Sequence, residues 1–84
     1  MLKDTEISSK LASFICRELL RRDDYPLADD EPLISGGLID SFSLVHISAF
    51  IEREFGVRLP DTELDSAHMD TVRAMTGRIR AGLG

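Results

Sequence analysis

Residues 36–56 read GGLIDSFSLVHISAFIEREFG, and this stretch decides how the chain folds. After the glycine pair come Asp40 and Ser41, whose side chains are both typical helix N-caps. Gly56 supplies the left-handed residue that commonly follows the end of a helix. We therefore expect a helix that starts at Asp40 or Ser41 and ends at Phe55.

The predicted helix has two faces of different character. With a step of about 100° per residue, one stripe faces the core and consists of Leu44, Ile47, Ile51 and Phe55. A second strip, beside Ser41, points away from that stripe and consists of Phe42, Val45 and Ala49. Contiguous exposed apolar side chains typically mark a contact site. The alternative is that the preceding loop folds back over Phe42. The helical wheel gives Phe50 no clear position.

Two further helices are predicted from apolar periodicity. The first spans Asp4 to Arg22, with Asp4 or Thr5 as its cap. The last runs from Asp70 or Thr71 to about Ala81, and its apolar stripe consists of Val72, Met75, Thr76, Ile79 and Leu83. We expect the two glycines near the end of the chain, Gly82 and Gly84, to let this helix fray.

The remaining segments are expected to be connections. One short helical turn, from Leu64 to Ala67 or His68, is predicted to begin at Asp61 or Asp65. The long loop over residues 23–39 contains an acidic run that is typical of a solvated linker. Its pinning side chains are expected to be Tyr25, Leu27, Leu33, Ile34 and Leu38. No strand-like alternation is visible. The prediction is an all-α fold: three longer helices plus one short helix, a small four-helix bundle in one domain spanning residues 1–84.

Composition excludes several classes of function. The net charge of −5 argues against nucleic-acid binding, which depends on clustered Lys and Arg, and favours partners with basic surfaces. One cysteine, Cys16, allows no internal disulfide. No apolar run is long enough for a membrane span, and no signal-peptide pattern is present. We therefore expect a cytoplasmic protein, without membrane association and monomeric.

Neither an enzyme nor a metal site is predicted. A serine nucleophile needs a nearby base and an oxyanion hole, and His46 points about 140° away from Ser41 on the helix. Cys16, His46 and His68 are too far apart in sequence to suggest metal-ligand spacing. Cys16 lies off the apolar stripe of the first helix, so we expect it to be partly exposed.

Two interpretations of Ser41 are open. In the first, Ser41 is only an N-cap, and the chain is a small helical protein-interaction module. In the second, its hydroxyl accepts a phosphate group, because free amides and the dipole at a helix start favour an added phosphate. The two are physically compatible.

The motifs resemble those of a known family. Residues 37–45, GLIDSFSLV, contain an Asp-Ser-(large apolar) motif, and residues 50–60, FIEREFGVRLP, contain E-x-E-F-G followed by V-x-L-P. Both resemble the acyl carrier proteins and their near relatives, the discrete aminoacyl and D-alanyl carriers. The likeness extends more loosely over the first and last helices, so it covers nearly the whole chain.

The resemblance implies a function without catalysis. A phosphopantetheinyl transferase would attach 4′-phosphopantetheine from coenzyme A to Ser41, and the thiol of this arm would carry an acyl intermediate as a thioester. Asp40 would serve transferase recognition. The partner-binding surface would consist of Phe42, Val45, Ala49 and Glu52. Further partners would be an acyl- or aminoacyl-loading ligase and a downstream synthase or transferase, in fatty acid, polyketide or nonribosomal peptide biosynthesis.

The chain departs from fatty-acid carriers in ways that affect the expected cargo. Ser43, His46 and Arg53 stand where many of them have acids, which argues against primary fatty-acid synthesis. Phe42, in place of the more usual leucine, is closer to specialised discrete carriers. An aminoacyl carrier loaded by a dedicated ligase is therefore the alternative to an acyl carrier. If the cargo is a long apolar chain, it could enter the core near Leu44, Ile47, Ile51, Val72 and Met75.

Overall fold

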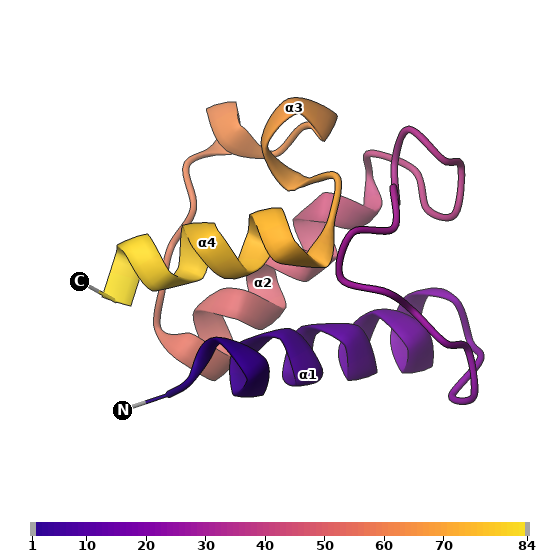
Figure 1. The fold of residues 1–84 in the computed structure, drawn as a ribbon. Coiled ribbons are helices and arrows are strands. Elements are labelled where there is room, and N and C mark those ends of the chain that lie inside the picture. Colours follow the sequence, from indigo (N-terminus) through magenta and orange to yellow (C-terminus); the bar gives the residue numbers. More distant parts are fainter. Residues whose placement is uncertain (1, 84) are drawn as a thin grey trace.

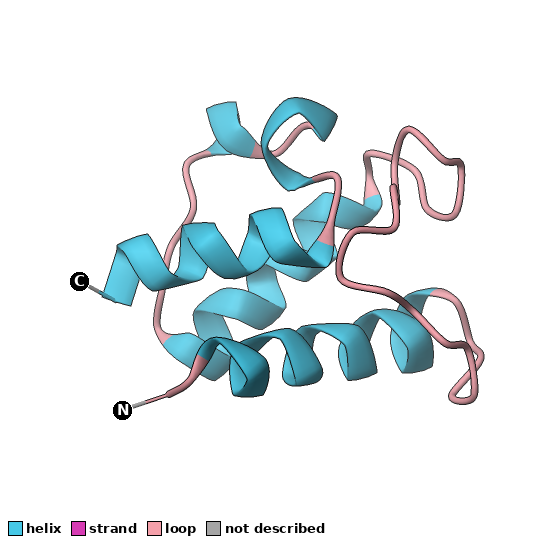
Figure 2. Ribbon diagram, viewed as in Figure 1, coloured by secondary structure: helices cyan, strands magenta, loops and turns pink. Residues whose placement is uncertain are grey.

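A computed structural model describes residues 2–83, in which all regular structure is helical and no strand occurs (Figure 2). The elements in order are α1 (Asp4–Phe14), the π-helical turn η1 (Ile15–Leu19), α2 (Ser43–Phe55), the 3₁₀ turn η2 (Asp61–Glu63), α3 (Ser66–Met69) and α4 (Val72–Leu83). The predicted all-α bundle, with its long loop between the first two helices, is confirmed.

The three longer helices surround one apolar core, with α4 lying in front of α2 and alongside α1 (Figure 1). The fully buried helical side chains are Ile7, Leu11, Ile15, Leu44, Ile47, Ile51, Met69, Val72, Met75 and Ile79. The stripe predicted for α2 is confirmed, since its first three members are buried and Phe55 is half-buried. α2 begins at one end of the bundle, and the start of α1 and the end of α4 lie at the other (Figure 1).

Phe50 completes the core by aromatic contacts that a single-helix projection could not reveal. Its ring stacks on Phe14 of α1, with centroids 4.3 Å apart. The ring of Phe55 packs edge-to-face against Phe50, with centroids 6.1 Å apart. The guanidinium of Arg53 lies over the Phe50 ring at 5.9 Å, which shields its outer side by a cation–π contact. Phe50 is therefore a core residue.

The predicted cap of α1 is wrong by one position. The cap position is Lys3, in extended conformation, rather than Asp4 or Thr5. The backbone N–H of Lys3 donates to Oε1 of Glu6 (3.2 Å), so a carboxylate of the first turn satisfies the N–H group at the cap position. The helix then needs no side-chain acceptor from Asp4 or Thr5.

Two predictions at the end of the first helix are wrong: the residue at which the helix ends and the exposure of Cys16. The helical path ends at Leu19, not Arg22, because η1 is followed by Arg21 with a left-handed backbone (φ 58°). Cys16 is buried rather than partly exposed, since the loop returns over it and its thiol donates to the carbonyl oxygen of Tyr25 (3.6 Å). Burial, together with the nearby carboxylates of Asp23 and Glu31, raises the pKa of this thiol.

The long loop is held by the side chains predicted to hold it. Leu33 is fully buried, while Leu27, Ile34 and Leu38 pack half-buried against the core. Tyr25 is also half-buried, and its hydroxyl donates to Glu31. Such anchoring explains how a long loop without helices or strands remains ordered in a compact fold.

The segment before α4 contains two short turns instead of the one predicted. Asp61 opens η2, and Asp65 caps α3 by accepting a hydrogen bond from the backbone N–H of His68 (3.0 Å). Thr71 caps α4 through its hydroxyl oxygen, which accepts from the N–H of Ala74 (3.0 Å). Both Asp65 and Thr71 were predicted as possible starting residues.

The last helix differs from prediction at its end. Four residues of its predicted stripe are buried (Val72, Met75, Thr76 and Ile79), but Leu83 is 43% exposed. Gly82 is not a point of fraying, because its backbone packs closely on Val57: a Cβ there would meet a Val57 methyl carbon at 2.4 Å. Gly84 lies outside the described residues.

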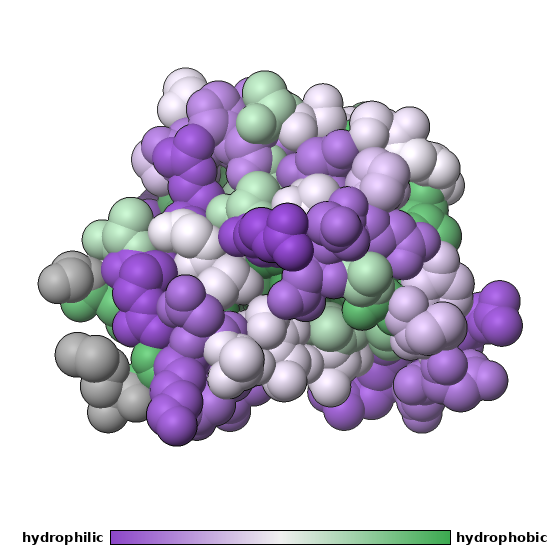
Figure 3. Space-filling view, in the orientation of Figure 1, coloured by the Kyte–Doolittle hydropathy of each residue, from purple (hydrophilic) through white to green (hydrophobic). Residues whose placement is uncertain are grey.

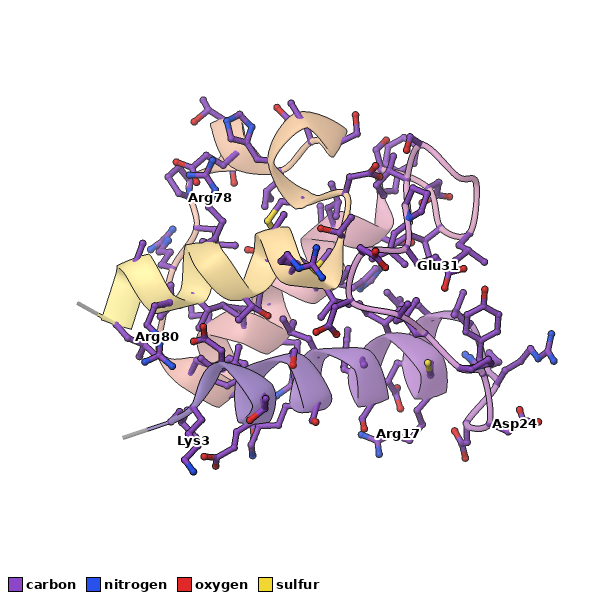
Figure 4. The ribbon with its side chains drawn as sticks, viewed as in Figure 1. Lys3, Arg17, Asp24, Glu31, Arg78 and Arg80 are labelled. Atoms are coloured by element: carbon purple, nitrogen blue, oxygen red, sulfur yellow. The ribbon has the colours of Figure 1, made fainter. Side chains whose placement is uncertain are left out.

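Ion pairs join the helices around the core. Arg80 of α4 reaches the start of α1, where it meets Asp4 at 2.8 Å, and Arg78 meets Glu63 of η2 at 2.9 Å (Figure 4). The face formed by α1 and α4 is covered largely by hydrophilic side chains (Figure 3). Among residues 2–83, no helix is both long and apolar enough to span a membrane.

Candidate functional site

The segment Asp40–Phe42 forms a tight turn that leads into α2. The backbone N–H groups of Ser43, Leu44 and Val45 each bond to the carbonyl oxygen three residues earlier, at 3.1–3.2 Å. This 3₁₀-type pattern places the start of the α-helix at Ser43, later than the predicted Asp40 or Ser41. The predicted end at Phe55 is confirmed, and Gly56 follows with φ 73°.

Asp40 performs the capping. Its Oδ1 accepts hydrogen bonds from the backbone N–H of Ser43 (3.1 Å) and from the Ser43 hydroxyl (3.2 Å). A short acceptor side chain at a helix start compensates for the missing backbone partners of the first turn. Asp40 is exposed, and its second carboxylate oxygen accepts no hydrogen bond from residues 2–83.

The hydroxyl of Ser41 differs from those of the nearest serines. Ser43 donates its hydroxyl to Asp40, and Ser35 donates its hydroxyl to Oδ2 of Asp70 (2.6 Å). Ser41 is exposed, and its hydroxyl has no hydrogen-bond partner within the described chain. Because the cap is made by Asp40, the turn leaves the Ser41 oxygen free for other chemistry.

The free hydroxyl stands beside unused backbone donors. The N–H groups of Ser41 and Phe42 bond to no acceptor in the part of the chain that the structure describes. Free amides at a helix start attract anions, and the helix dipole adds to this effect. The turn therefore suits an oxygen that carries a phosphate group.

An apolar strip follows Ser41 along the outer face of α2. Phe42 is 80% exposed and Val45 is 60% exposed, and Ala49 one turn later is also exposed. The alternative in which the loop covers Phe42 is excluded by this exposure. Glu52 is exposed further along the same helix. The sequence-predicted site residues thus occupy one helix and the turn leading into it.

Asp70 holds the loop that leads to Ser41, and the sequence analysis missed this role. Its Oδ1 accepts from the backbone N–H groups of Ile34 (2.8 Å) and Ser35 (2.9 Å), while Oδ2 accepts from the Ser35 hydroxyl. The backbone carbonyl of Asp70 also accepts from Leu33 N–H (2.7 Å). These bonds, led by the one from the Ser35 hydroxyl, lower the pKa of Asp70.

The titratable side chains of Asp65 and His68 stabilise the start of α3. The ring of His68 pairs with Asp65 at 2.7 Å, and this hydrogen bond lowers the pKa of the carboxyl group. Both residues belong to the cap of α3, away from the turn at Ser41. Within residues 2–83 no three metal-ligating side chains come together.

The comparisons with known proteins bear on nearly the whole chain. The model of one protein family, described as the phosphopantetheine attachment site, matches residues 10–79. That range includes the turn at Ser41, α2, α3 and most of α4. A comparison with curated proteins found no match.

Proposed function

This chain belongs to the phosphopantetheine attachment-site family, and we propose that Ser41 is the residue to which the 4′-phosphopantetheine is attached. As a member of the family, the chain is a carrier of this covalent group. The free, exposed hydroxyl of Ser41 is the single observation that carries the assignment, since Ser35 and Ser43 both use their hydroxyls inside the fold.

The attachment needs a second protein, a phosphopantetheinyl transferase. The Ser41 oxygen forms a new bond to the phosphorus that bears the pantetheine, and the anhydride bond of coenzyme A breaks. Adenosine 3′,5′-bisphosphate leaves, and the serine proton passes to a base of the transferase. The free amides of the turn at Ser41 favour the phosphodiester that results.

The function that we propose is transport of an acyl group. The thiol of the arm carries the group as a thioester and presents it to a loading ligase and to a downstream synthase or transferase. The chain itself contributes no catalytic group, and it acts as a monomer in the cytoplasm without nucleic acid or membrane partners. Its role is to hold one covalent arm where other enzymes reach it.

The outer face of α2 is the proposed docking surface, and it consists of Phe42, Val45, Ala49 and Glu52. The exposed Phe42 and Val45 provide apolar area at its centre, which is the usual character of interface anchors. Asp40 offers its second carboxylate oxygen to a basic group of the transferase. His46 and Arg53 lie on the same helix, so this surface is less acidic than the whole chain.

The experiment is intact-mass measurement after incubation with coenzyme A and a broad-specificity phosphopantetheinyl transferase. We expect one added phosphopantetheinyl group on the native chain and none on Ser41→Ala. Ser43→Ala and Ser35→Ala serve as matched controls and retain the addition. Modification that persists in Ser41→Ala refutes the assignment, and absence of modification in the native chain favours a plain interaction module.

A second candidate is an aminoacyl carrier, of the D-alanyl type or another, loaded by a dedicated ligase. It is favoured by the closed core, because Leu44, Ile51 and Met75 are all fully buried. A long apolar cargo must separate packed helices to enter there, whereas a small polar cargo need not. Ligands that bind the folded state raise its stability. Melting temperatures that do not change with acyl length count against core binding and support the aminoacyl carrier.

A further inference from the structure

A groove opens directly beside the turn that carries Ser41. It has a volume of about 560 Å³, and residues of η1, the loop, the turn and the start of α2 line it: Leu19, Ile34, Gly37, Leu38, Ile39, Asp40 and Ser43. Asp40 and Ser43 stand on either side of Ser41 in the chain. The attachment point is therefore within two residues of the groove lining along the chain.

The lining of this groove has both apolar and polar parts. Leu19, Ile34 and Leu38 are half-buried, so each keeps part of its side chain open to solvent. Gly37 adopts a left-handed backbone (φ 80°), and a Cβ placed there would meet nothing within 4 Å. The N–H of Gly37 donates to the carbonyl oxygen of Ile34 (3.1 Å), whereas its own carbonyl oxygen accepts no hydrogen bond within residues 2–83 and is open to a ligand.

Other depressions in the described surface are less suited to a group attached at Ser41. The one under the loop is lined by residues including Cys16 and Tyr25, and another lies between α1 and α4 near Thr76. Neither includes a residue of the turn at Ser41. On the inner side of α2, Leu44 and Ile47 are fully buried and leave no open surface.

We propose that this groove, which we call the loop groove, is the resting site of the phosphopantetheine arm when no partner is bound. The proposal rests on attachment at Ser41. Pantetheine contains a dimethyl-substituted carbon and two amide groups. The first matches the exposed parts of the three apolar side chains, and an amide N–H can donate to the free carbonyl oxygen of Gly37. Burial of apolar area holds the arm there, and withdrawal of the arm by a partner needs no separation of helices.

This location also restricts the cargo. An arm that lies against Leu19 and Leu38 holds its thioester at the surface, outside the core. Short or polar acyl and aminoacyl groups remain hydrated there, whereas a long alkyl chain gains little from a groove that is open to water. The loop groove thus fits a carrier of short or polar intermediates.

The test compares backbone amide resonances of the ¹⁵N-labelled protein before and after conversion by a phosphopantetheinyl transferase, with conversion checked by intact mass. We expect the signals of Leu19, Ile34 and Gly37 to shift in addition to those next to Ser41. Leu19 is far from Ser41 in sequence, so its shift requires contact through space. Nuclear Overhauser contacts between the arm's methyl groups and Leu38 provide a second measurement in the unmutated chain.

A pair of matched variants tests the groove itself. Leu38→Ala removes an apolar wall, while Leu27→Ala removes a half-buried leucine of the same loop that lines a different depression. We expect Leu38→Ala to lose most of the Leu19 shift and Leu27→Ala to keep it.

Three results overturn the proposal. Shifts confined to residues 40–43 mean that the arm is free in solvent. Shifts at Val72 and Met75 without shifts at Leu19 mean that the arm enters between α2 and α4. A native chain that gains no mass overturns the proposed function and this inference with it.

Discussion

Replacing Asp70 by alanine removes the group that fastens the long loop to the start of α4. Two backbone N–H groups, of Ile34 and Ser35, and the Ser35 hydroxyl then lose their acceptor. A hydrogen bond to a charged acceptor contributes about 1.5–3 kcal/mol, but Ser35 is exposed and water replaces much of what it loses. We therefore expect the free energy of unfolding to fall by about 2 kcal/mol in total.

The assay is thermal and urea unfolding followed by circular dichroism. For a domain of this length the loss corresponds to a decrease in melting temperature of about 8–16 °C. Asp70→Asn keeps one oxygen that can accept from both backbone groups, so it should lose about half as much. Asp30→Ala serves as the control, since Asp30 is an exposed acid of the same loop.

The dependence on pH follows from the lowered pKa of Asp70. A carboxyl group whose pKa is lower in the folded state stabilises the protein above its unfolded pKa, and this contribution is lost as the pH falls through the folded value. The difference between the native chain and Asp70→Ala should therefore be constant at neutral pH and shrink on acidification below the ordinary pKa of 3.8. If Asp70→Ala is as stable as Asp30→Ala at neutral pH, or if hydrogen exchange of the Ile34 and Ser35 amides is unchanged, the reasoning is wrong.

Three further predictions follow from exposure and packing. Phe42→Ala should leave the free energy of unfolding within about 0.5 kcal/mol of the native value but slow modification by the transferase, because the ring is 80% exposed; a large loss of stability in urea unfolding would place it in the core. Gly77→Ala should stabilise α4 by about 1 kcal/mol, whereas Gly82→Ala should lose this gain or reverse it by contact with Val57; equal melting temperatures for the two variants would contradict the packing. Cys16 should react slowly with a thiol reagent in the native protein and rapidly in urea, since it is buried and its pKa is raised; equal rates would show an open thiol.

The sequence predicted the parts of the fold that depend on local signals. α2 ends where Gly56 permits a left-handed residue, and the exposed strip at Phe42 follows from helical periodicity alone. Local signals could not predict that the Ser41 hydroxyl makes no hydrogen bond within residues 2–83. Asp40 and Ser41 are both good caps, and only the three-dimensional turn decides that Asp40 takes the role.

The errors have a common physical cause, which is contact between segments distant in sequence. Cys16, in η1, lies off the apolar stripe of the predicted first helix and is buried because the loop returns over it. Asp70 was predicted as a possible start of the last helix. Its partners, however, are residues 34 and 35, which precede it in sequence by α2 and α3. Gly82 looked like a flexible end until the approach of Val57 was known.

The start of α2 is well separated from the start of α1 and the end of α4 (Figure 1), and this has a practical consequence. Arg80 binds Asp4, so the beginning of α1 and the last turns of α4 are held together, and both lie opposite the turn at Ser41 (Figure 1). A fluorescent label, an affinity tag or a surface linker fused to either end should leave the serine unobstructed. Immobilised protein can therefore be presented to candidate transferases with its modifiable side facing the solution.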